Sequence, residues 1–251
     1  MKRIIFSIAA LLLIGISGYS QELTGKQVIE KADALQRGET NEGEMSMTII
    51  RPKWERTINM KSWSKGTEYS MTYITSPVKD KGQVFLKRKS EMWNWVPTIN
   101  RMIKLPPSMM SQGWMGSDYS NDDILKESSI VVDYIHKIVG NDIIEGLECY
   151  KIELIPKEDA AVVWGKIITN IDTTTYTSNK DTFYDEDGEE VRYFLYDKVK
   201  KIGKYYTPTV WRIQSVDKKE KYTEIILEDI KYDTEISKEY FKKSALKRFS
   251  R

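Results

Sequence analysis

The chain has 251 residues, of which 40% are hydrophobic, 30% charged and 11% aromatic. This composition excludes a disordered or collagen-like chain and is typical of a globular protein with a sizeable core. Lys and Arg together number 39, against 37 Asp and Glu. Lys2 and Arg3 account for this difference, so the rest of the chain lacks the basic excess that nucleic-acid binding needs.

The N-terminus has the three parts of a secretory signal peptide. Residues 1–3 carry positive charge, residues 4–16 are an apolar run, and Gly18 and Ser20 are small residues before a cleavage position at Gln21. The apolar run is shorter than the about 20 residues that cross a bilayer, so an uncleaved anchor is the weaker interpretation. We expect a signal peptide over residues 1–20 and a mature protein in the periplasm.

The mature chain begins with a predicted helix and continues as strands. Residues 24–37 place Val28, Ile29, Ala32 and Leu35 on one helical face. From residue 42 the hydrophobic period changes to two, which predicts a meander of short antiparallel strands. The predicted strands of this first half are 42–49, 54–61, 69–73, 83–89, 91–96 and 100–105.

An irregular insert interrupts the meander over residues 106–127. Pro106 and Pro107 are incompatible with a central strand, while Ser120 and Asp123 match a helix capping box. Strands resume at 130–139, 147–155, 163–171, 173–184, 190–197, 208–216 and 221–231, and a helix is predicted over 237–247. We expect one mainly β domain, residues 21–251, in which about ten or eleven strands form a single curled antiparallel sheet.

The sequence offers little for catalysis. Cys149 is the only cysteine and His136 the only histidine, so the usual zinc sets are excluded, and no Gly-x-Ser-x-Gly motif marks a nucleophile. Cys149 lies in a strand-like run and is interpreted as a packed, inert thiol. We expect no enzyme activity, no metal and no cofactor, and an esterase that uses His136 is the weakest alternative.

Methionine and tryptophan are concentrated in the first half of the mature chain. Nine of the ten methionines and five of the seven tryptophans lie between Met45 and Met115. Methionine conforms to irregular apolar shapes and tryptophan adds large rigid area, so this cluster predicts an apolar cavity, although ordinary core packing is the alternative. Residues 105–116 combine three methionines and a tryptophan with proline and glycine, which favours an apolar lid.

The side chains expected to line the cavity and its lid come from this window. They are Met47, Ile58, Met60, Met71, Tyr73, Phe85, Trp93, Trp95, Met102, Met109, Met110, Trp114 and Met115. The basic clusters at 87–89 and 242–248 are interpreted as solvated faces, with anionic lipid headgroups or an acidic partner as the alternative.

Three segments resemble the outer membrane lipoprotein-sorting proteins, which share the fold of the periplasmic lipoprotein carrier LolA. They are residues 93–97 (Trp-Asn-Trp-Val-Pro), 100–106 and 113–123, and the Gly-x-Met-Gly-Ser-Asp stretch at 113–118 is the most specific of them. The resemblance implies an unclosed antiparallel β-barrel whose concave face is covered by helices. The arginine that latches the lid of the carrier is not assigned to a residue of this sequence, because no position matches it securely.

The same resemblance implies a function and partners. The protein would bind the acyl chains of a lipoprotein or lipid in its cavity and move them between inner- and outer-membrane components. The implied partners are an inner-membrane transporter of the resistance-nodulation-division type or an outer-membrane acceptor, and not nucleic acid. The alternative is a regulatory module of the cell envelope on the same fold, which senses lipid or lipoprotein.

Overall fold

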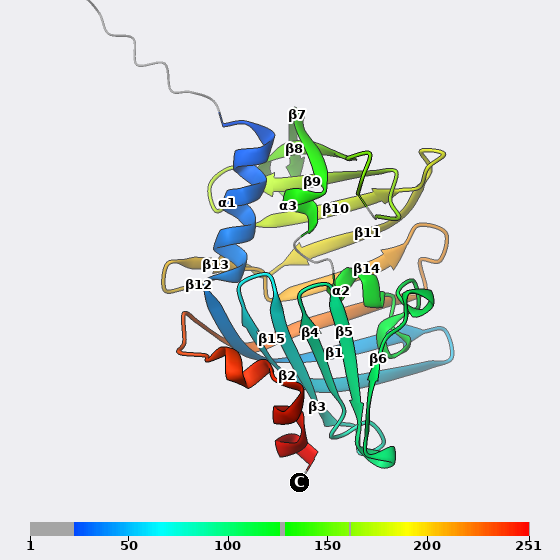
Figure 1. Ribbon diagram of the computed structural model, residues 1–251. Helices are drawn as coiled ribbons and strands as arrows, with labels where there is room; N and C mark the ends of the chain where they lie inside the picture. Colours follow the sequence, from blue (N-terminus) through cyan, green and yellow to red (C-terminus); the bar gives the residue numbers. More distant parts are fainter. Residues whose placement is uncertain (1–22, 126–128, 161, 251) are drawn as a thin grey trace, which may run out of the picture.

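A 13-stranded antiparallel sheet dominates the computed structural model, which describes residues 23–125, 129–160 and 162–250. The strand order is β6-β5-β4-β3-β2-β1-β15-β14-β11-β10-β9-β8-β7, and β12 and β13 form a separate two-stranded sheet. The large sheet curls strongly and its two edges, β6 and β7, stay unpaired, so the barrel is not closed (Figure 1). The prediction of a mainly β, unclosed curled sheet is confirmed, although it contains more strands than expected.

The sheet consists of two meanders joined by the pairing of β1 with β15. The first meander contains β1 (Thr40–Arg51), β2 (Trp54–Lys65), β3 (Tyr69–Ser76), β4 (Val84–Arg88), β5 (Glu91–Val96) and β6 (Arg101–Lys104). The second contains β7 (Tyr134–Ile144), β8 (Leu147–Pro156), β9 (Lys166–Asp172), β10 (Ser178–Tyr184), β11 (Glu190–Asp197), β14 (Val210–Ser215) and β15 (Tyr222–Tyr232). The small hairpin of β12 (Lys200–Ile202) and β13 (Tyr205–Thr207) was not predicted from the sequence.

Helix α1 (Gly25–Arg37) confirms the predicted N-terminal helix. Thr24 and Gln27 form a reciprocal capping box, and Gly38 follows the helix with a φ of 67°, a value that favours glycine. Gly25 packs so closely on β7 that an added Cβ would lie 3.2 Å from the backbone of His136. Helix α1 is therefore held against the sheet from its first residue.

The C-terminal segment is not the α-helix expected over 237–247. It forms two 3-10 stretches, η4 (Lys238–Phe241) and η5 (Lys243–Ser250), separated by Lys242 in an extended conformation. The expected strand at 173–184 is also shorter, because the Asp172 side chain accepts hydrogen bonds from the backbone N–H groups of Thr174 and Thr175 and closes a turn. A short helix, α3 (Ser129–Val132), occupies the start of the strand predicted at 130–139.

Three apolar clusters make up the interior. The first packs α1, through Val28 and Ile29, on strands β8 to β11, and the second packs the insert on β1 to β5. Ile225 of β15 contacts both clusters, so they share the concave face of the sheet. The third lies on the opposite face, where Phe241 and Leu246 of the C-terminal segment are fully buried.

The predicted signal peptide, residues 1–20, lies outside the described residues. In the part of the chain that the structure does describe, no helix is both long and apolar enough to span a bilayer.

Candidate functional site

The insert between β6 and β7 crosses the gap of the unclosed barrel and covers the concave face. Its described residues form short helical turns rather than long helices, namely η2 (Pro107–Met109), η3 (Trp114–Gly116), α2 (Asn121–Leu125) and then α3. Trp114 is 5% exposed and its ring lies edge-on to Phe85 of β4, with 5.1 Å between the ring centroids. Met110, Met115 and Leu125 pack around the same cluster. The insert therefore fills the apolar concave face with its own side chains.

A tight loop at 113–120 presents Trp114 to the sheet. An added Cβ on Gly113 would lie 2.2 Å from the carbonyl oxygen of Ser117, so the loop closes only around glycine. The Trp114 backbone N–H donates to the carbonyl of Tyr119 at 2.6 Å, and the Ser117 hydroxyl donates to the carbonyl of Trp114 at 2.7 Å. These bonds make the loop a rigid support for the tryptophan.

Two arginines of the sheet hold two aspartates of the insert. At the end of β1, Arg51 forms a bidentate pair with Asp118, with Nη1–Oδ2 and Nη2–Oδ1 distances of 3.0 and 3.1 Å. The Thr223 hydroxyl of β15 donates to the same carboxylate at 2.7 Å. On β11, Arg192 pairs with Asp123 of α2 through Nη2–Oδ1 and Nη1–Oδ2 distances of 2.5 and 2.8 Å. The insert is thus fixed to both meanders.

The Arg192 pair is the more buried of the two. The side chains of Arg192 and Asp123 are 11% and 12% exposed. The guanidinium carbon lies 4.4, 4.7 and 5.0 Å from the ring centroids of Trp164, Phe183 and Phe194, which are cation–π distances. Asp123 also accepts the backbone N–H of Ser120 at 2.8 Å, which confirms the predicted capping box.

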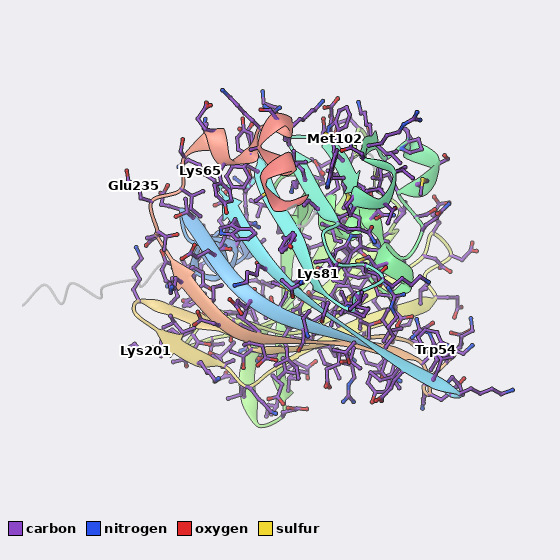
Figure 2. The ribbon with its side chains drawn as sticks, turned by 90° about the horizontal axis from the view of Figure 1, so that it is seen from below. Trp54, Lys65, Lys81, Met102, Lys201 and Glu235 are labelled. Carbon is purple, nitrogen blue, oxygen red and sulfur yellow. The ribbon has the colours of Figure 1, made fainter. Side chains whose placement is uncertain are left out.

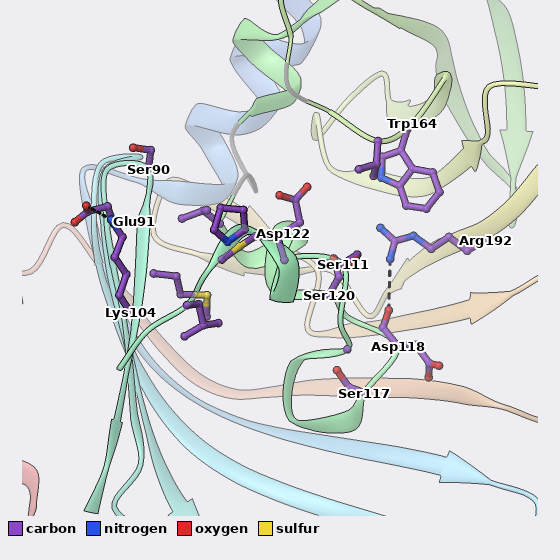
Figure 3. A pocket seen from close by; sticks show the side chains of 17 residues that line it. Ser90, Glu91, Lys104, Ser111, Ser117, Asp118, Ser120, Asp122, Trp164 and Arg192 are labelled. Atoms are coloured by element: carbon purple, nitrogen blue, oxygen red, sulfur yellow. Dashed lines mark hydrogen bonds and ion pairs between the residues drawn. The ribbon is translucent and has the colours of Figure 1, made fainter. Parts of the chain in front are cut away.

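A cavity of about 940 Å³ lies between the insert and the two sides of the gap. Figure 3 shows Ser90, Glu91 and Lys104 on one side, Trp164 and Arg192 on the other, and the insert between them. Apolar and polar groups both line it; the apolar ones include Met92, Leu105, Met110, Leu125, Val163 and Trp164, and the polar ones Ser111, Ser117, Ser120, Asp118 and Asp122. Such a lining suits an apolar ligand with a polar end.

An ion pair stands at the edge of this cavity. The Lys104 ammonium lies 2.5 Å from the Glu91 carboxylate, and this hydrogen bond lowers the pKa of Glu91. Among the described residues, no three His, Cys, Asp or Glu side chains are grouped to hold a metal ion.

The residues predicted to line a cavity fall into two sets on opposite faces of the sheet. The concave-face cluster contains Met47, Ile58, Met60, Phe85, Met110, Trp114 and Met115, and of these Met110 also lines the cavity. The opposite face carries Met71, Tyr73, Trp93, Trp95 and Met102, under the C-terminal segment. Met109 is 38% exposed and belongs to neither cluster.

The alternation of strand residues explains this division. Phe85 of β4 pairs with Asn94 of β5, whereas its neighbour Leu86 pairs with Trp93, so consecutive residues point to opposite faces. A window rich in methionine and tryptophan therefore supplies both faces.

Sequence reasoning missed the two arginine pairs. A signal for one of them is present, because Arg192 stands at the same alternating position as the apolar Phe194 and so is an inward-facing charge that requires a partner. Nothing local to Arg51 or Asp118 indicates their pairing, since they meet only in the folded sheet.

Comparisons with known proteins agree on the fold. The sequence profile of a protein family described as "-like: Uncharacterized protein" matches residues 66–248. No protein of curated function matches the sequence. The chain is similar to three solved structures that are each under 25% identical to it, and their likeness is one of fold.

These three proteins come from three different bacteria. A DUF1329 family protein from Desulfovibrio piger is 23% identical with a TM-score of 0.81, over 88% of this chain and 97% of that one. An outer membrane lipoprotein-sorting protein domain from Vibrio parahaemolyticus is 20% identical with a TM-score of 0.80, over 89% and 98%. A LolA superfamily protein from Nitrosomonas europaea is 22% identical with a TM-score of 0.74, over 88% and 99%.

Proposed function

The chain belongs to the protein family whose profile matches residues 66–248 and has the fold of the LolA-like structures, and on this premise we propose that it is a periplasmic carrier that buries the acyl chains of a lipoprotein or lipid beneath its insert. One observation carries the proposal. The concave face is apolar, and among the described residues the second cluster on that face is covered by the insert alone, through Trp114, Met110 and Leu125. An acyl chain can take the place of these side chains. The protein acts by burial, and no bond is made or broken.

The cavity provides the entry to this face. Met110 and Leu125 belong to the apolar cluster and also line the cavity, so a ligand in the cavity contacts the side chains that it has to displace. Each buried methylene contributes about 0.8 kcal/mol, so a chain of about ten methylenes releases enough free energy to offset partial displacement of the insert. The polar groups of the cavity lie where the headgroup would remain.

The two arginine pairs determine how much free energy is needed to move the insert away from the sheet. Arg51 and Arg192 favour the closed arrangement through Asp118 and Asp123, and a ligand shifts the equilibrium only by the difference between its affinities for the open and closed forms. Binding is therefore reversible, as a carrier requires.

Adjacent methionines of the insert give a matched test. Met110 lines the cavity, whereas Met109 is 38% exposed, does not line the cavity and belongs to none of the apolar clusters. We expect the wild-type protein to take up a fluorescent fatty acid, Met110→Glu to weaken uptake about tenfold or more because a carboxylate desolvates poorly, and Met109→Glu to bind like the wild type. Met102 lies on the opposite face of the sheet, so Met102→Glu should bind the fatty acid like the wild type. This variant tests whether only the concave-face residues contact the ligand.

The proposal is wrong if the folded wild-type protein ignores the fatty acid, or if Met110→Glu and Met109→Glu bind it equally well. Circular dichroism spectra of each variant establish that the fold is kept.

Export and partners complete the proposed function. We propose that residues 1–20 are removed during export, which N-terminal sequencing of the periplasmic protein tests by the presence of Gln21 as the first residue. The proposed donor is an inner-membrane transporter of the resistance-nodulation-division type, and the proposed recipient is an outer-membrane acceptor. Crosslinking in cells with and without cargo tests both, and a single partner held only when cargo is bound would indicate the sensory alternative instead.

A further inference from the structure

Two hairpin turns of the first meander present apolar side chains to solvent at one end of the molecule. Val78, between β3 and β4, is 91% exposed, and Ile99, between β5 and β6, is 55% exposed. The two turns contact each other, since an added Cβ on Gly82 would lie 3.3 Å from the ring of Pro97. They point downward in Figure 1, and Figure 2 looks onto this end, with Lys81 near the middle of the view.

The charge at this end is positive. Lys79, Lys81 and Arg101 are exposed, and within residues 76–104 the only acids are Asp80 and Glu91. Asp80 is buried and turned inward, with its carboxylate 2.6 Å from Arg56. Glu91 stands at the other end of β5, paired with Lys104. The turns therefore present cations around exposed apolar side chains, and neither of the two acids within residues 76–104 is exposed beside them.

The β3–β4 turn is built to hold this arrangement. The backbone N–H groups of Asp80 and Lys81 both donate to the carbonyl of Pro77 at 2.9 Å, and the Gln83 amide donates to the Asp80 carboxylate at 3.3 Å. An ordered turn that exposes Val78 loses little conformational entropy on docking.

We propose that this end of the molecule, the surface formed by Val78, Lys79, Lys81, Ile99 and Arg101, docks on an anionic lipid bilayer. Apolar tips enter the boundary between headgroups and acyl chains while lysine and arginine contact the anionic headgroups. Val78 and Ile99 are too few to form the apolar core that a stable protein interface has, whereas two apolar tips surrounded by cations can enter the headgroup region of an anionic bilayer, so a bilayer is the better fit.

Docking in this orientation leaves the cavity accessible. Ser90 and Glu91, at the start of β5, line the cavity, whereas Ile99 lies beyond the other end of the same strand. The membrane contact and the ligand site are therefore separate surfaces, and the docking proposal does not depend on what the cavity binds.

Co-sedimentation with vesicles tests the proposal on the full mature chain. We expect the protein to sediment with vesicles of phosphatidylglycerol and phosphatidylcholine at low salt, and not with phosphatidylcholine alone. Val78→Ser/Ile99→Ser removes the tips and Lys79→Glu/Lys81→Glu reverses the charge; each should weaken binding about tenfold or more. Added salt should weaken the wild-type interaction in the same way.

Two control variants carry the same changes elsewhere on the surface. Ile143→Ser alters a residue of β7 that is 74% exposed, and Lys200→Glu/Lys201→Glu reverses two exposed lysines of β12. Both should sediment like the wild type. The proposal is overturned if the wild type does not bind anionic vesicles, if it binds neutral vesicles equally, or if the control variants lose as much binding as the turn variants. Fatty-acid uptake is measured on every variant, so a failure here is distinguishable from a failure of the carrier function.

Discussion

Removal of the Asp123 carboxylate should release the insert from the sheet. In Asp123→Ala, the Arg192 guanidinium stays among three aromatic rings without its counter-ion. Both side chains are about nine-tenths buried, so solvent screens the pair weakly, and breaking a buried pair costs about 3–5 kcal/mol. Loss of the capping bond to Ser120 adds about 1 kcal/mol. We expect the variant to lose a total of about 4–6 kcal/mol of stability. This loss should appear first as local opening of the insert, before the whole sheet unfolds.

Hydrogen exchange followed by mass spectrometry measures that opening directly. Amides of residues 110–125 should exchange faster in Asp123→Ala, while strands β8 and β9 keep their wild-type protection. Asp123→Asn retains a capping acceptor and should cost about 1 kcal/mol less than the alanine variant.

A double variant distinguishes the free energy lost with the ion pair from the cost of leaving the Arg192 charge buried without a partner. Asp123→Leu/Arg192→Met removes both charges and should recover most of the stability, because uncompensated burial is the larger part of the cost. Exchange in the insert that stays at the wild-type rate in Asp123→Ala, or a double variant less stable than either single one, would refute this reasoning.

Four further outcomes are expected. Burial raises the pKa of Asp181, although the hydroxyls of Thr169 and Tyr196 act in the opposite direction. The stabilisation from its protonated form is complete below the ordinary pKa of 3.8 and is lost as the pH rises from there through the folded-state pKa, so Asp181→Asn should remove this decline of the unfolding free energy over that pH range, measured in urea titrations. Burial also raises the pKa of the Cys149 thiol, which should resist iodoacetamide until denaturant is added; rapid labelling of the native protein would contradict its packing. Phe241→Ala removes a fully buried ring of the third cluster and should lower the free energy of unfolding by about 3–5 kcal/mol, measured by urea denaturation. Gly113→Ala should disturb the Trp114 loop and shift tryptophan fluorescence, which an unchanged spectrum would disprove.

Local signals in the sequence predicted local structure well. Thr24 and Gly38 bound α1 as expected, and strands β5 and β11 occupy the predicted residues 91–96 and 190–197. The period of two and the turn residues specify such elements without help from distant contacts. The C-terminal segment departs from its predicted helix because Phe241 and Leu246 have to reach the sheet from separate short turns.

The candidate site was predictable in its composition but not in its geometry. The sequence pointed to an apolar insert, and the structure places Trp114 over the concave face. Alternation alone does not say which face of a strand is concave, so Trp95 and Met60 looked equivalent although they lie on opposite sides. The ties from Arg51 to Asp118 and from Arg192 to Asp123 depend on long-range contacts that no short pattern encodes.

The position of β15 beside β1 also determines the order in which the molecule can assemble. Most neighbouring strands are joined by short turns and can pair as soon as both strands have been synthesised. The pairing of β1 with β15 instead brings Asn41 to Tyr232 and Ile50 to Tyr222, which closes a loop over most of the chain and carries the largest entropic cost. Until that ladder forms, β1 remains an open edge of a partly built sheet, able to pair with the wrong chain. The last strand in the described part of the chain, β15, is thus the one that covers the edge of the first, so the native sheet forms only after β15 has been made.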